Sequence, residues 1–506
     1  MSSASVISLL LHDEVETIRL GEDLALALKS GDCLCLSGDL GAGKSTLARA
    51  FIRAMAEDSE LEVPSPTFTL VQSYDLRIPI AHFDLYRVTD GSELDELGLD
   101  EALSDGICLV EWPEMADAEL PKDRIRVTLT HEGAGRRVEI TGSATAMARI
   151  SRALLIRQFL TNHGYADGQR RYLTGDASLR AYETLLCQDG KRYILMDWPR
   201  RPDGPPVLDG KPYPKVAHLA EEVLPFVAIA QYLRDIGLRA PDIVASDFDS
   251  GLLLLEDLGQ SGVLDDGGKP ITERYMASID CLAHLHHQTA PTIIAVDPQH
   301  QHQVPLFDPV AMKIETRLLI DWYLPWKNGG IPATDIQRER YSRVWDGLIA
   351  ELGDCERHLL LRDYHSPNLI WQAHEEELRR VGLIDFQDAM IGPTAYDVAS
   401  LVQDARVDIP STLGDALLAH YLRLRHAQGN FDETSFLKAF AIMSAQRNCK
   451  LAGIWVRLKE RDGKPGYLKH MPRTLRYLAA VLEHPVLAPL RQWMAQAGID
   501  VSESRT

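Results

Sequence analysis

Short apolar runs alternate with helical patterns through the first part of the chain. Residues 32–39, "DCLCLSGD", form an apolar run that leads into a glycine-rich loop, and residues 45–57 continue with the spacing of a helix. This alternation is typical of an α/β unit built on a mainly parallel sheet. Over residues 131–146 glycine, serine and threonine accumulate and the periodicity fades, before an amphipathic pattern resumes at residues 147–160. We therefore predict a first domain of residues 1–143.

The remainder of the chain follows a different pattern. Residues 172–186 and 191–199 alternate as two strands around a tight turn, and residues 251–259 form a further strand. Beyond about residue 260 the apolar spacing is mainly helical, with strand and loop segments at residues 359–371 and 380–389. The pattern predicts an α+β unit with a small β-rich lobe followed by a large helical lobe. We place these lobes at residues 144–258 and 259–506.

Composition places the chain among ordinary globular proteins. It has 506 residues, 45% of them hydrophobic and 25% charged, and none of its apolar runs approaches the ~18 residues that span a bilayer. The N-terminus lacks the basic segment of a signal peptide, and seven scattered cysteines fit reduced thiols. We expect a cytoplasmic protein with no membrane contact, in which Cys33 and Cys35 are small apolar residues of a strand.

Charge is distributed unevenly between the two parts. Residues 1–145 contain 27 acidic and 12 basic residues, whereas the remainder contains 46 and 41. An acidic domain repels a phosphate backbone, so we expect no direct nucleic-acid binding. Any role with a nucleic acid would run through a partner protein.

A phosphate-binding pattern lies between the first apolar run and its helix. Gly38, Gly43, Lys44 and Ser45 satisfy GxxxxGK[ST] between a strand and a helix, the context that a P-loop NTPase requires. Backbone N–H groups of such a loop surround phosphate oxygens, the lysine reaches the terminal phosphates and the serine hydroxyl holds Mg²⁺. The expected nucleotide-binding residues are Gly38, Asp39, Gly41, Ala42, Gly43, Lys44, Ser45 and Thr46.

A Mg-ATP site of this kind also needs carboxylates. Glu111 ends the apolar strand "GICLVE", and Asp84 lies on the apolar strand "AHFD". Thr67, in the loop "SPTFTL", is placed to sense the γ-phosphate. A buried acid on a strand can instead be structural. Together with the loop, the residues predict Mg²⁺ held by Ser45, Asp84 and Glu111, with Lys44 and Thr67 assisting hydrolysis.

Five segments in order resemble the bacterial TsaE family over about residues 8–130. They are "SGDLGAGKSTLARAF", "SPTFTLVQSY", "HFDLYRV", "ELDELGLDEAL" and "ICLVEWPE". The resemblance implies a small P-loop ATPase that works with TsaB and TsaD proteins in threonylcarbamoylation of a tRNA adenosine. It implies Lys44, Ser45, Thr67, Asp84 and Glu111 as ATPase residues, and it places Trp112 close to the nucleotide.

A second and unrelated phosphotransfer pattern lies in the helical lobe. Asp363 and Asn368 occupy a short loop after an apolar run, and Asp385 follows at the end of "VGLIDF". In kinases an aspartate of such a loop accepts the proton of the substrate hydroxyl, while an asparagine and a second aspartate hold Mg²⁺. His365, two positions after Asp363, suits small-molecule kinases better than protein kinases.

The β-rich lobe is expected to hold the ATP of this second site. "TGDASLRAY", residues 174–182, is a candidate turn over the phosphates, and Glu256 to Leu258 are a candidate hinge for adenine. Leu361 replaces the histidine of the HRD pattern, and "YILMDWP" lacks the usual kinase lysine. Arg180 and Lys191 are therefore both candidates for the phosphate clamp.

Residues 150–480 resemble the aminoglycoside phosphotransferase superfamily and, more narrowly, the anomeric sugar kinases called AmgK. The segments that carry the resemblance include "GDASLRAYE", "LLLEDLG", "RDYHSPNLIW", "IDFQDAMIGPTAYDVASLVQDAR" and "RLKERDGKPGYLKHMPR". The resemblance implies a bilobal protein-kinase-like fold and phosphorylation of N-acetylmuramate and N-acetylglucosamine in peptidoglycan recycling. Candidate sugar contacts are His365, Asp321, Trp322, Arg457 and Arg461, because an arginine fork suits the lactyl carboxylate of muramate.

Two alternatives remain open. The first domain can be a nucleotide-dependent binding switch rather than a turnover enzyme. The second can be an aminoglycoside or amino-alcohol kinase. A cationic substrate of that kind favours an acidic pocket, and the presence of Arg457 and Arg461 argues mildly against such a pocket.

Overall fold

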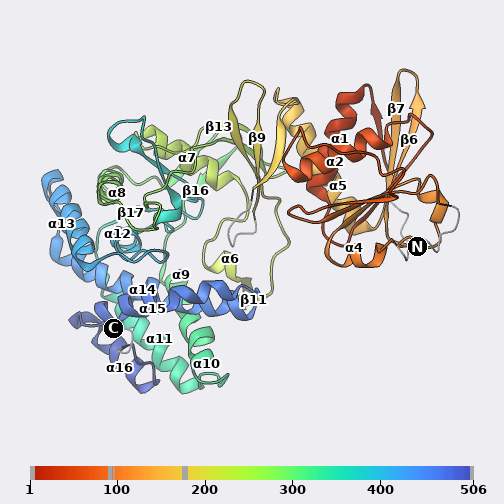
Figure 1. Ribbon diagram of the computed structural model, residues 1–506. Helices are drawn as coiled ribbons and strands as arrows, with labels where there is room; N and C mark the ends of the chain where they lie inside the picture. Colours follow the sequence, from red (N-terminus) through yellow and green to blue (C-terminus); the bar gives the residue numbers. More distant parts are fainter. Residues whose placement is uncertain (1–5, 89–93, 95–96, 174–179, 502–506) are drawn as a thin grey trace. The chain divides into compact units, whose positions relative to one another are not determined.

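The computed structural model describes residues 6–88, 94, 97–173 and 180–501. Its contacts divide the chain into two compact units, Met1–Asp197 and Trp198–Thr506 (Figure 1). The first unit contains the P-loop sequence, and the second contains the candidate kinase loop.

A seven-stranded sheet, in the order β1-β7-β6-β2-β5-β4-β3, forms the centre of the first unit. The strands are β1 (Ile7–Leu11), β2 (Cys33–Ser37), β3 (Val71–Tyr74), β4 (Ile80–Asp84), β5 (Ile107–Glu111), β6 (Ile125–Glu132) and β7 (Gly135–Thr141). The four strands β6, β2, β5 and β4 pair in parallel, whereas β3, β7 and β1 are added antiparallel at the two edges. The predicted α/β fold with a mainly parallel sheet is confirmed.

Helices cover both faces of this sheet (Figure 1). The helices α1 (Glu14–Ala27), α2 (Lys44–Ala56) and α5 (Ala144–Asn162) share one apolar core with Leu34 and Leu36 of β2. The helix α4 (Leu99–Asp105) and the 3₁₀ turn η1 (Pro113–Ala116) lie over the opposite face, where Cys33 and Cys35 point. The two thiols are buried and free, with 3.8 Å between their sulfur atoms, as expected for small apolar residues of a strand.

Three antiparallel strands follow α5 in the same unit. They are β8 (Gln169–Leu173), β9 (Ala181–Leu186) and β10 (Arg192–Asp197), and β9 lies between the other two. The predicted strand pair around residues 172–199 is therefore present. Residues 174–179 of the candidate phosphate turn lie outside the described residues. The predicted domain boundaries after residues 143 and 258 stay predictions.

The second unit combines small β-hairpins with many helices. Its hairpins are β11 (Pro206–Leu208) with β12 (Lys211–Pro212), β13 (Ile243–Asp247) with β14 (Leu252–Glu256), and β15 (Ile293–Ala295) with β16 (Gln301–Gln303). Its main helices are α6 (Tyr213–Val216), α7 (Leu224–Asp235), α8 (Thr272–Leu285), α9 (Pro309–Leu318), α10 (Leu324–Lys327), α11 (Asp335–Ala350), α12 (Ala395–Val402), α13 (Ser411–Gln428), α14 (Glu433–Glu460), α15 (Met471–Val481) and α16 (Ala488–Gln496). The long helix α14 is buried through most of its length and packs against α9, α12 and α15.

Two short strand pairs interrupt the helices where the sequence predicts strands and loops. Strand β17 (Arg357–Leu360) pairs with β20 (Met390–Pro393), and β18 (Leu369–Trp371) pairs with β19 (Val381–Leu383). The loop from β17 to β18 carries Asp363 and Asn368, and the loop from β19 to β20 carries Asp385. These pairs bring together two loops that are separate in the sequence.

Candidate active sites

The glycine-rich loop between β2 and α2 has a conformation that demands glycine. Gly38, Gly41 and Gly43 have φ angles of 141°, 81° and 106°, where side chains other than hydrogen are strained. A Cβ atom at Gly38 would also lie 2.3 Å from the carbonyl oxygen of Leu129. The loop is therefore fixed by its glycines, and α2 begins directly after it at Lys44. A helix N-terminus behind such a loop is suited to an anion.

The side chain of Lys44 bends back over this loop. Its Nζ donates hydrogen bonds to the carbonyl oxygens of Gly38 (2.6 Å) and Asp39 (3.0 Å). The same Nζ lies 3.6 Å from the centre of the Trp112 ring. Burial lowers the pKa of Lys44, and nearby carboxylates led by Glu111 oppose this shift. The ammonium group thus lies over the glycine-rich loop, and its contact with phosphate stays a prediction.

Glu111 joins the P-loop to the neighbouring strand. Its Oε2 accepts a hydrogen bond of 2.8 Å from the Ser45 hydroxyl, and its Oε1 lies 3.0 Å from His82 Nε2. Both Glu111 and His82 are about 1% exposed. Sequence reasoning missed His82, although it lies two residues before Asp84 on β4, so both side chains point to the same face of the sheet. His82 fixes the orientation of the carboxylate that contacts Ser45.

Asp84 binds two side chains of the loop that follows α2. Its Oδ2 accepts hydrogen bonds from Ser65 Oγ (2.8 Å) and Thr67 Oγ1 (2.9 Å), and its Oδ1 accepts one from the backbone N–H of Tyr86 (3.1 Å). The structure therefore brings the predicted residues Thr67 and Asp84 together and adds Ser65 to them.

An arginine not selected from the sequence lies beside the P-loop. A Cβ atom at Gly43 would lie 3.0 Å from Nε of Arg136 on β7. That Nε is buried without a hydrogen-bond partner, and Nη1 lies 3.4 Å from Thr17 Oγ1 of α1. On the other side of the loop, Trp112 follows β5 with a φ of 59°, and its ring lies 5.0 Å from that of Tyr86.

The second site is built on a turn that a buried carboxylate holds in shape. Asp397 of α12 accepts hydrogen bonds from the backbone N–H groups of Leu361 (2.5 Å) and Arg362 (2.9 Å). Arg362 has a φ of 70°, and the N–H of Asp363 bonds to the carbonyl oxygen of Leu361. Burial raises the pKa of Asp397 to about 7, although the two N–H donors oppose this shift. The turn places Asp363 at the end of β17.

The three acidic and amide groups predicted from spacing converge. Asn368 Nδ2 donates to the carbonyl oxygen of Asp363 (2.8 Å) and lies 3.3 Å from Asp385 Oδ2. Asp385 has a φ of 62°, and its Oδ1 accepts from Gln387 Nε2 at 3.1 Å. Mg²⁺ is commonly held by only one or two protein groups together with phosphate oxygens. The side chains of Asn368 and Asp385 suit that arrangement.

Buried cations surround Asp363. Burial alone would raise the pKa of this carboxyl, but Lys450, His365 and Arg362 outweigh it and lower the pKa. Glu315 of α9, which is fully buried, binds both cations, with Arg362 in direct contact and Lys450 Nζ at 2.8 Å. Sequence reasoning missed Glu315 and Lys450, because nothing in their own segments marks them.

The other candidate ATP-binding residues of the kinase lie in both units. Arg180 lies just before β9, in the first unit. Lys191, by contrast, forms an exposed ion pair with Asp189. In the second unit, Glu256 pairs with Arg239, and the carbonyl oxygen of Leu258 accepts from Gln372 Nε2 at 2.6 Å.

The candidate sugar contacts are dispersed. Asp321 and Trp322 lie in the π-helical turn Leu319–Tyr323, where Asp321 pairs with Arg338. Arg461 is exposed and pairs with Asp462 at 2.7 Å. Arg457 lies 5.5 Å from the centre of the Tyr213 ring, and its burial lowers its pKa. His365 is buried within the loop that carries Asp363, and burial also lowers its pKa.

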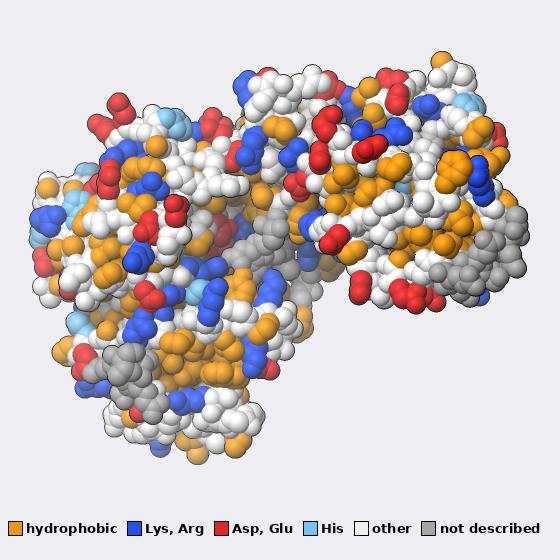
Figure 2. Space-filling model, viewed as in Figure 1, with side chains coloured by type: hydrophobic (Ala, Val, Ile, Leu, Met, Phe, Trp, Pro, Cys, Tyr) orange, Lys and Arg blue, Asp and Glu red, His pale blue; other side chains and the backbone are white. Residues whose placement is uncertain are grey.

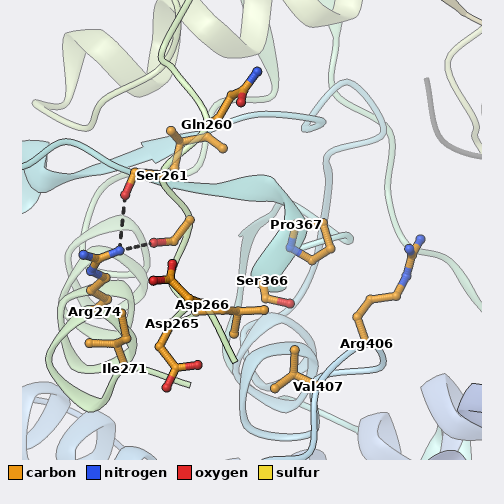
Figure 3. A pocket seen from close by; sticks show the side chains of 13 residues that line it. Gln260, Ser261, Asp265, Asp266, Ile271, Arg274, Ser366, Pro367, Arg406 and Val407 are labelled. Atoms are coloured by element: carbon orange, nitrogen blue, oxygen red, sulfur yellow. Dashed lines mark hydrogen bonds between the residues drawn. The ribbon is translucent and has the colours of Figure 1, made fainter. Parts of the chain in front are cut away.

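A pocket of about 720 Å³ borders the loop that carries Asp363 (Figure 3). Ser366 and Pro367 line it on one side, and Asp265 and Asp266 line it from the segment that follows the candidate hinge. Arg274 donates to Ser261 Oγ (3.3 Å) and to the carbonyl oxygen of Gly262 (2.5 Å), which ties that segment to α8 (Figure 3). The pocket is therefore polar, with acidic groups close to the turn that carries Asp363.

Comparison with known proteins identifies both parts of the chain. The family described as "Phosphotransferase enzyme family" matches residues 170–437, more than half of the sequence. The chain belongs to this phosphotransferase family. The family described as "Threonylcarbamoyl adenosine biosynthesis protein TsaE" matches residues 11–138, so the N-terminal part belongs to the TsaE family. The resemblances stated from motifs are confirmed.

Two relatives of similar sequence each match one of these two parts. The N-acetylmuramate/N-acetylglucosamine kinase of Caulobacter vibrioides is 33% identical over 353 residues, which are 66% of this chain and 93% of that protein. The tRNA threonylcarbamoyladenosine biosynthesis protein TsaE of Bacillus subtilis is 40% identical over 131 residues, 26% of this chain and 80% of that protein. A solved ethanolamine kinase of Plasmodium vivax aligns with 69% of this chain and 91% of its own, at 12% identity and a TM-score of 0.44.

The family membership fixes the broad chemistry. The phosphotransferase fold is the predicted bilobal kinase-like fold, and the chain is an enzyme that combines an ATPase domain with a phosphotransferase. Both families use ATP. Among the described residues, every helix is too short or too polar to cross a membrane.

Proposed function

We propose that the second part of the chain is an ATP-dependent anomeric kinase of N-acetylmuramate and N-acetylglucosamine. The observation that carries the proposal is the convergence of Asp363, Asn368 and Asp385. It occurs in a chain that is 33% identical to the N-acetylmuramate/N-acetylglucosamine kinase of Caulobacter vibrioides. The ionised state of Asp363, favoured by the cations around it, suits a group that takes a proton.

In this reaction Asp363 orients the anomeric hydroxyl of the sugar and accepts its proton. Mg-ATP, when bound, supplies the phosphoryl group and neutralises the charge that develops on it. Asn368 and Asp385 are the residues that would hold Mg²⁺, and Asn368 also fixes the backbone of Asp363 through its carbonyl oxygen. Asp397 keeps the turn in the conformation that presents the carboxylate.

The test is a phosphorylation screen of the purified chain against both amino sugars, aminoglycosides and choline-like alcohols. We expect turnover of the amino sugars, with an acid-labile product that no longer gives a reducing-sugar signal. A phosphate on the primary hydroxyl would contradict the anomeric assignment.

One observation favours a second candidate, an aminoglycoside or amino-alcohol kinase. Asp265 and Asp266 line the pocket beside the turn that carries Asp363, together with Arg274 and Arg406, and the acidic pair suits a cationic acceptor. In the same screen, turnover of cationic acceptors with none of the amino sugars would favour this candidate.

We propose that the first domain hydrolyses Mg-ATP in support of tRNA threonylcarbamoylation by TsaB- and TsaD-like partners in the cytoplasm. The hydrogen bond of Ser45 to Glu111 supports a role of both residues in holding Mg²⁺. The hydrogen bond of Thr67 to Asp84 supports a role of Thr67 near the γ-phosphate. On the face shown in Figure 2, the first unit presents separated acidic and basic side chains rather than a continuous basic surface, which fits access to tRNA through partners.

Reconstitution tests this second assignment. Hydrolysis that is slow alone and strongly accelerated by the TsaB- and TsaD-like proteins would support it. The alternative, a binding switch, would be favoured by a different result. In that case the partners bind only when ATP is present, and tRNA modification is complete even when ATP is not hydrolysed.

A further inference from the structure

Arg170 of β8 is a buried cation at the contact between helix α1 of the TsaE-like domain and the strands β8–β10 that follow this domain. Its side chain is 1% exposed. Its Nη1 donates to Asp23 Oδ1 of α1 at 2.6 Å, and its Nε and Nη2 donate to both carboxylate oxygens of Glu183 on β9 at 2.7 and 2.8 Å. A guanidinium that binds two carboxylates in this way is held in one orientation. Helix α1 and strands β8 and β9 are therefore fixed to one another.

A second arginine repeats the connection from α5. Arg157 donates from Nε to Asp23 Oδ1 at 3.1 Å and from Nη2 to Glu22 Oε2 at 3.0 Å. Its Nη1 also donates to the carbonyl oxygens of Ala166 and Gly168, just before β8. Asp23, only 3% exposed in its side chain, thus binds two arginines from two different elements.

The surface around these charges is closely packed. Arg77, from the loop between β3 and β4, stacks on Tyr172 of β8 with 4.2 Å to the ring centre. A Cβ atom at Gly168 would lie 2.6 Å from a methyl carbon of Leu185. The cavity left between Met55 of α2, Arg170 and Tyr172 has a volume of about 10 Å³, no larger than one water molecule requires.

Helix α5 belongs to both sides of this contact. Met147 and Ile150 lie in the apolar core beneath α1 and α2. Arg152 of the same helix donates from Nε to Asp197 of β10 at 3.0 Å. A helix that is part of one core and also binds the last strand of the next element cannot act as a flexible linker.

We propose that the TsaE-like domain is a permanent docking partner of strands β8–β10, and that the ionic cluster of Asp23, Arg157, Arg170 and Glu183 is the specific contact that holds them. The physical basis is that removal of one partner from a buried, hydrogen-bonded ion pair is strongly destabilising, because the remaining charge stays buried without compensation. Separating the domain from the strands would leave Arg170 with one carboxylate instead of two. The fusion therefore has a structural consequence for the kinase, because β8–β10 are its first strands.

A third carboxylate, Glu22, lies beside this cluster, and it is not equivalent to Asp23. Asp23 lies between both arginines, whereas Glu22 contacts Arg157 alone and is more exposed. Burial and the neighbouring Asp23 raise the pKa of Glu22, although Arg157 opposes them. Loss of the Asp23 charge should therefore weaken the contact, whereas loss of the Glu22 charge should not.

The experiment compares three full-length variants that each remove one acid from α1. They are Asp23→Asn, Glu22→Gln and, as the matched control on an exposed position of the same helix, Glu14→Gln. The readouts are the thermal midpoint and amide hydrogen exchange in peptides that cover β8 and β9. For Asp23→Asn we expect exchange in β8 and β9 at least tenfold faster and a midpoint lower by on the order of 5 °C. Glu22→Gln and Glu14→Gln should match the parent chain in both readouts.

The adjacent pair of variants keeps the proposal testable if Asp23→Asn does not fold. Failure of Asp23→Asn alone, with Glu22→Gln folded and protected, supports the docking contact. Unchanged exchange in β8 and β9 of a folded Asp23→Asn chain, or equal destabilisation by Glu22→Gln, would overturn it. These readouts do not use sugar or tRNA chemistry, so they stand apart from the proposed functions.

Discussion

The conformation and charge of Asp363 depend on residues from distant segments as well as on its neighbour Arg362. Asp397 fixes its turn, and Lys450 and Arg362 favour its charged form. If Asp363 accepts the proton of the sugar hydroxyl, Asp363→Asn should lower the rate of sugar phosphorylation by roughly 10² or more. Steady-state kinetics and ATP binding by calorimetry measure the two effects, and ATP affinity should change little.

Asp385→Asn is the contrasting variant for this prediction. Its carboxylate is assigned to Mg²⁺, so the change should weaken Mg-ATP binding itself. Near-normal turnover of Asp363→Asn would rule out the mechanism. Asp354→Asn, at an exposed position before β17, serves as the control that should retain full activity.

His82 offers a test of the first site. Because His82 orients Glu111 from a fully buried position, His82→Ala should reduce ATP hydrolysis by about tenfold or more while leaving ATP binding nearly intact. Hydrolysis rates and nucleotide affinities of the variant decide this. An equal loss of binding and hydrolysis would indicate a structural role for the histidine instead.

Glu315 should make the stability of the second unit sensitive to acid. Burial raises its pKa, but Arg362 and Lys450 outweigh burial and lower the pKa from 4.5 to about 2. The carboxylate therefore stabilises the fold fully above pH 4.5, and this contribution is lost as the pH falls from 4.5 towards 2. A shift of this size corresponds to about 3 kcal/mol.

Urea unfolding at several pH values measures this contribution. We expect the free energy of unfolding of the parent chain to fall more steeply between pH 5 and pH 3 than that of Glu315→Gln. Parallel pH profiles for the two proteins would show that Glu315 is not ionised in the fold.

At the scale of elements, the packing of α5 provides a test of where the first domain ends. The pattern around residues 131–146 predicts an end after residue 143, yet Met147, Ile150 and Ala153 of α5 lie in the apolar core beneath the sheet. A fragment of residues 1–166 should therefore bind Mg-ATP and unfold at a temperature higher than a fragment of residues 1–143. Calorimetry on both fragments makes the comparison, and equal stability would place the boundary at residue 143.

The short strand pairs show a second element-level principle. The strand pairs β17 with β20 and β18 with β19 have strands of only three or four residues. They nevertheless bring Asp363, Asn368 and Asp385 together. The tight turns after β17 and β19 need left-handed backbone at Arg362 and Asp385, which side chains adopt only when the surrounding structure imposes it. Such strain is typical of functional loops, and here it occurs at Asp385 and at Arg362, the residue directly before Asp363.

At the scale of the whole chain, the two phosphotransfer sites are built from separate loops. Lys44 belongs only to the P-loop, so Lys44→Ala should abolish the support of tRNA threonylcarbamoylation while sugar phosphorylation persists. Parallel assays on the same folded preparation test this. Loss of both activities in a folded variant would show that nucleotide binding in the first domain controls the kinase.

The sequence alone determined the features that depend on neighbours along the chain. Gly38 to Ser45 encode a loop because glycine permits backbone angles that other residues avoid, and this restriction is local. Apolar periodicity predicted the parallel sheet, the β-rich strands and the strand and loop segments around residues 359–389. The spacing of Asp363, Asn368 and Asp385 was readable for the same reason.

Only the tertiary structure decided which distant groups complete these sites. Glu315 and Lys450 lie far from Asp363 in the sequence, His82 meets Glu111 across two parallel strands, and Asp23 meets Arg170 between two elements. Each is a polar residue whose own segment looks ordinary. Their partners are chosen by packing, because a buried charge is tolerated only where the fold supplies an opposite charge from another element. No local pattern records that pairing, so it becomes visible only when the chain is folded.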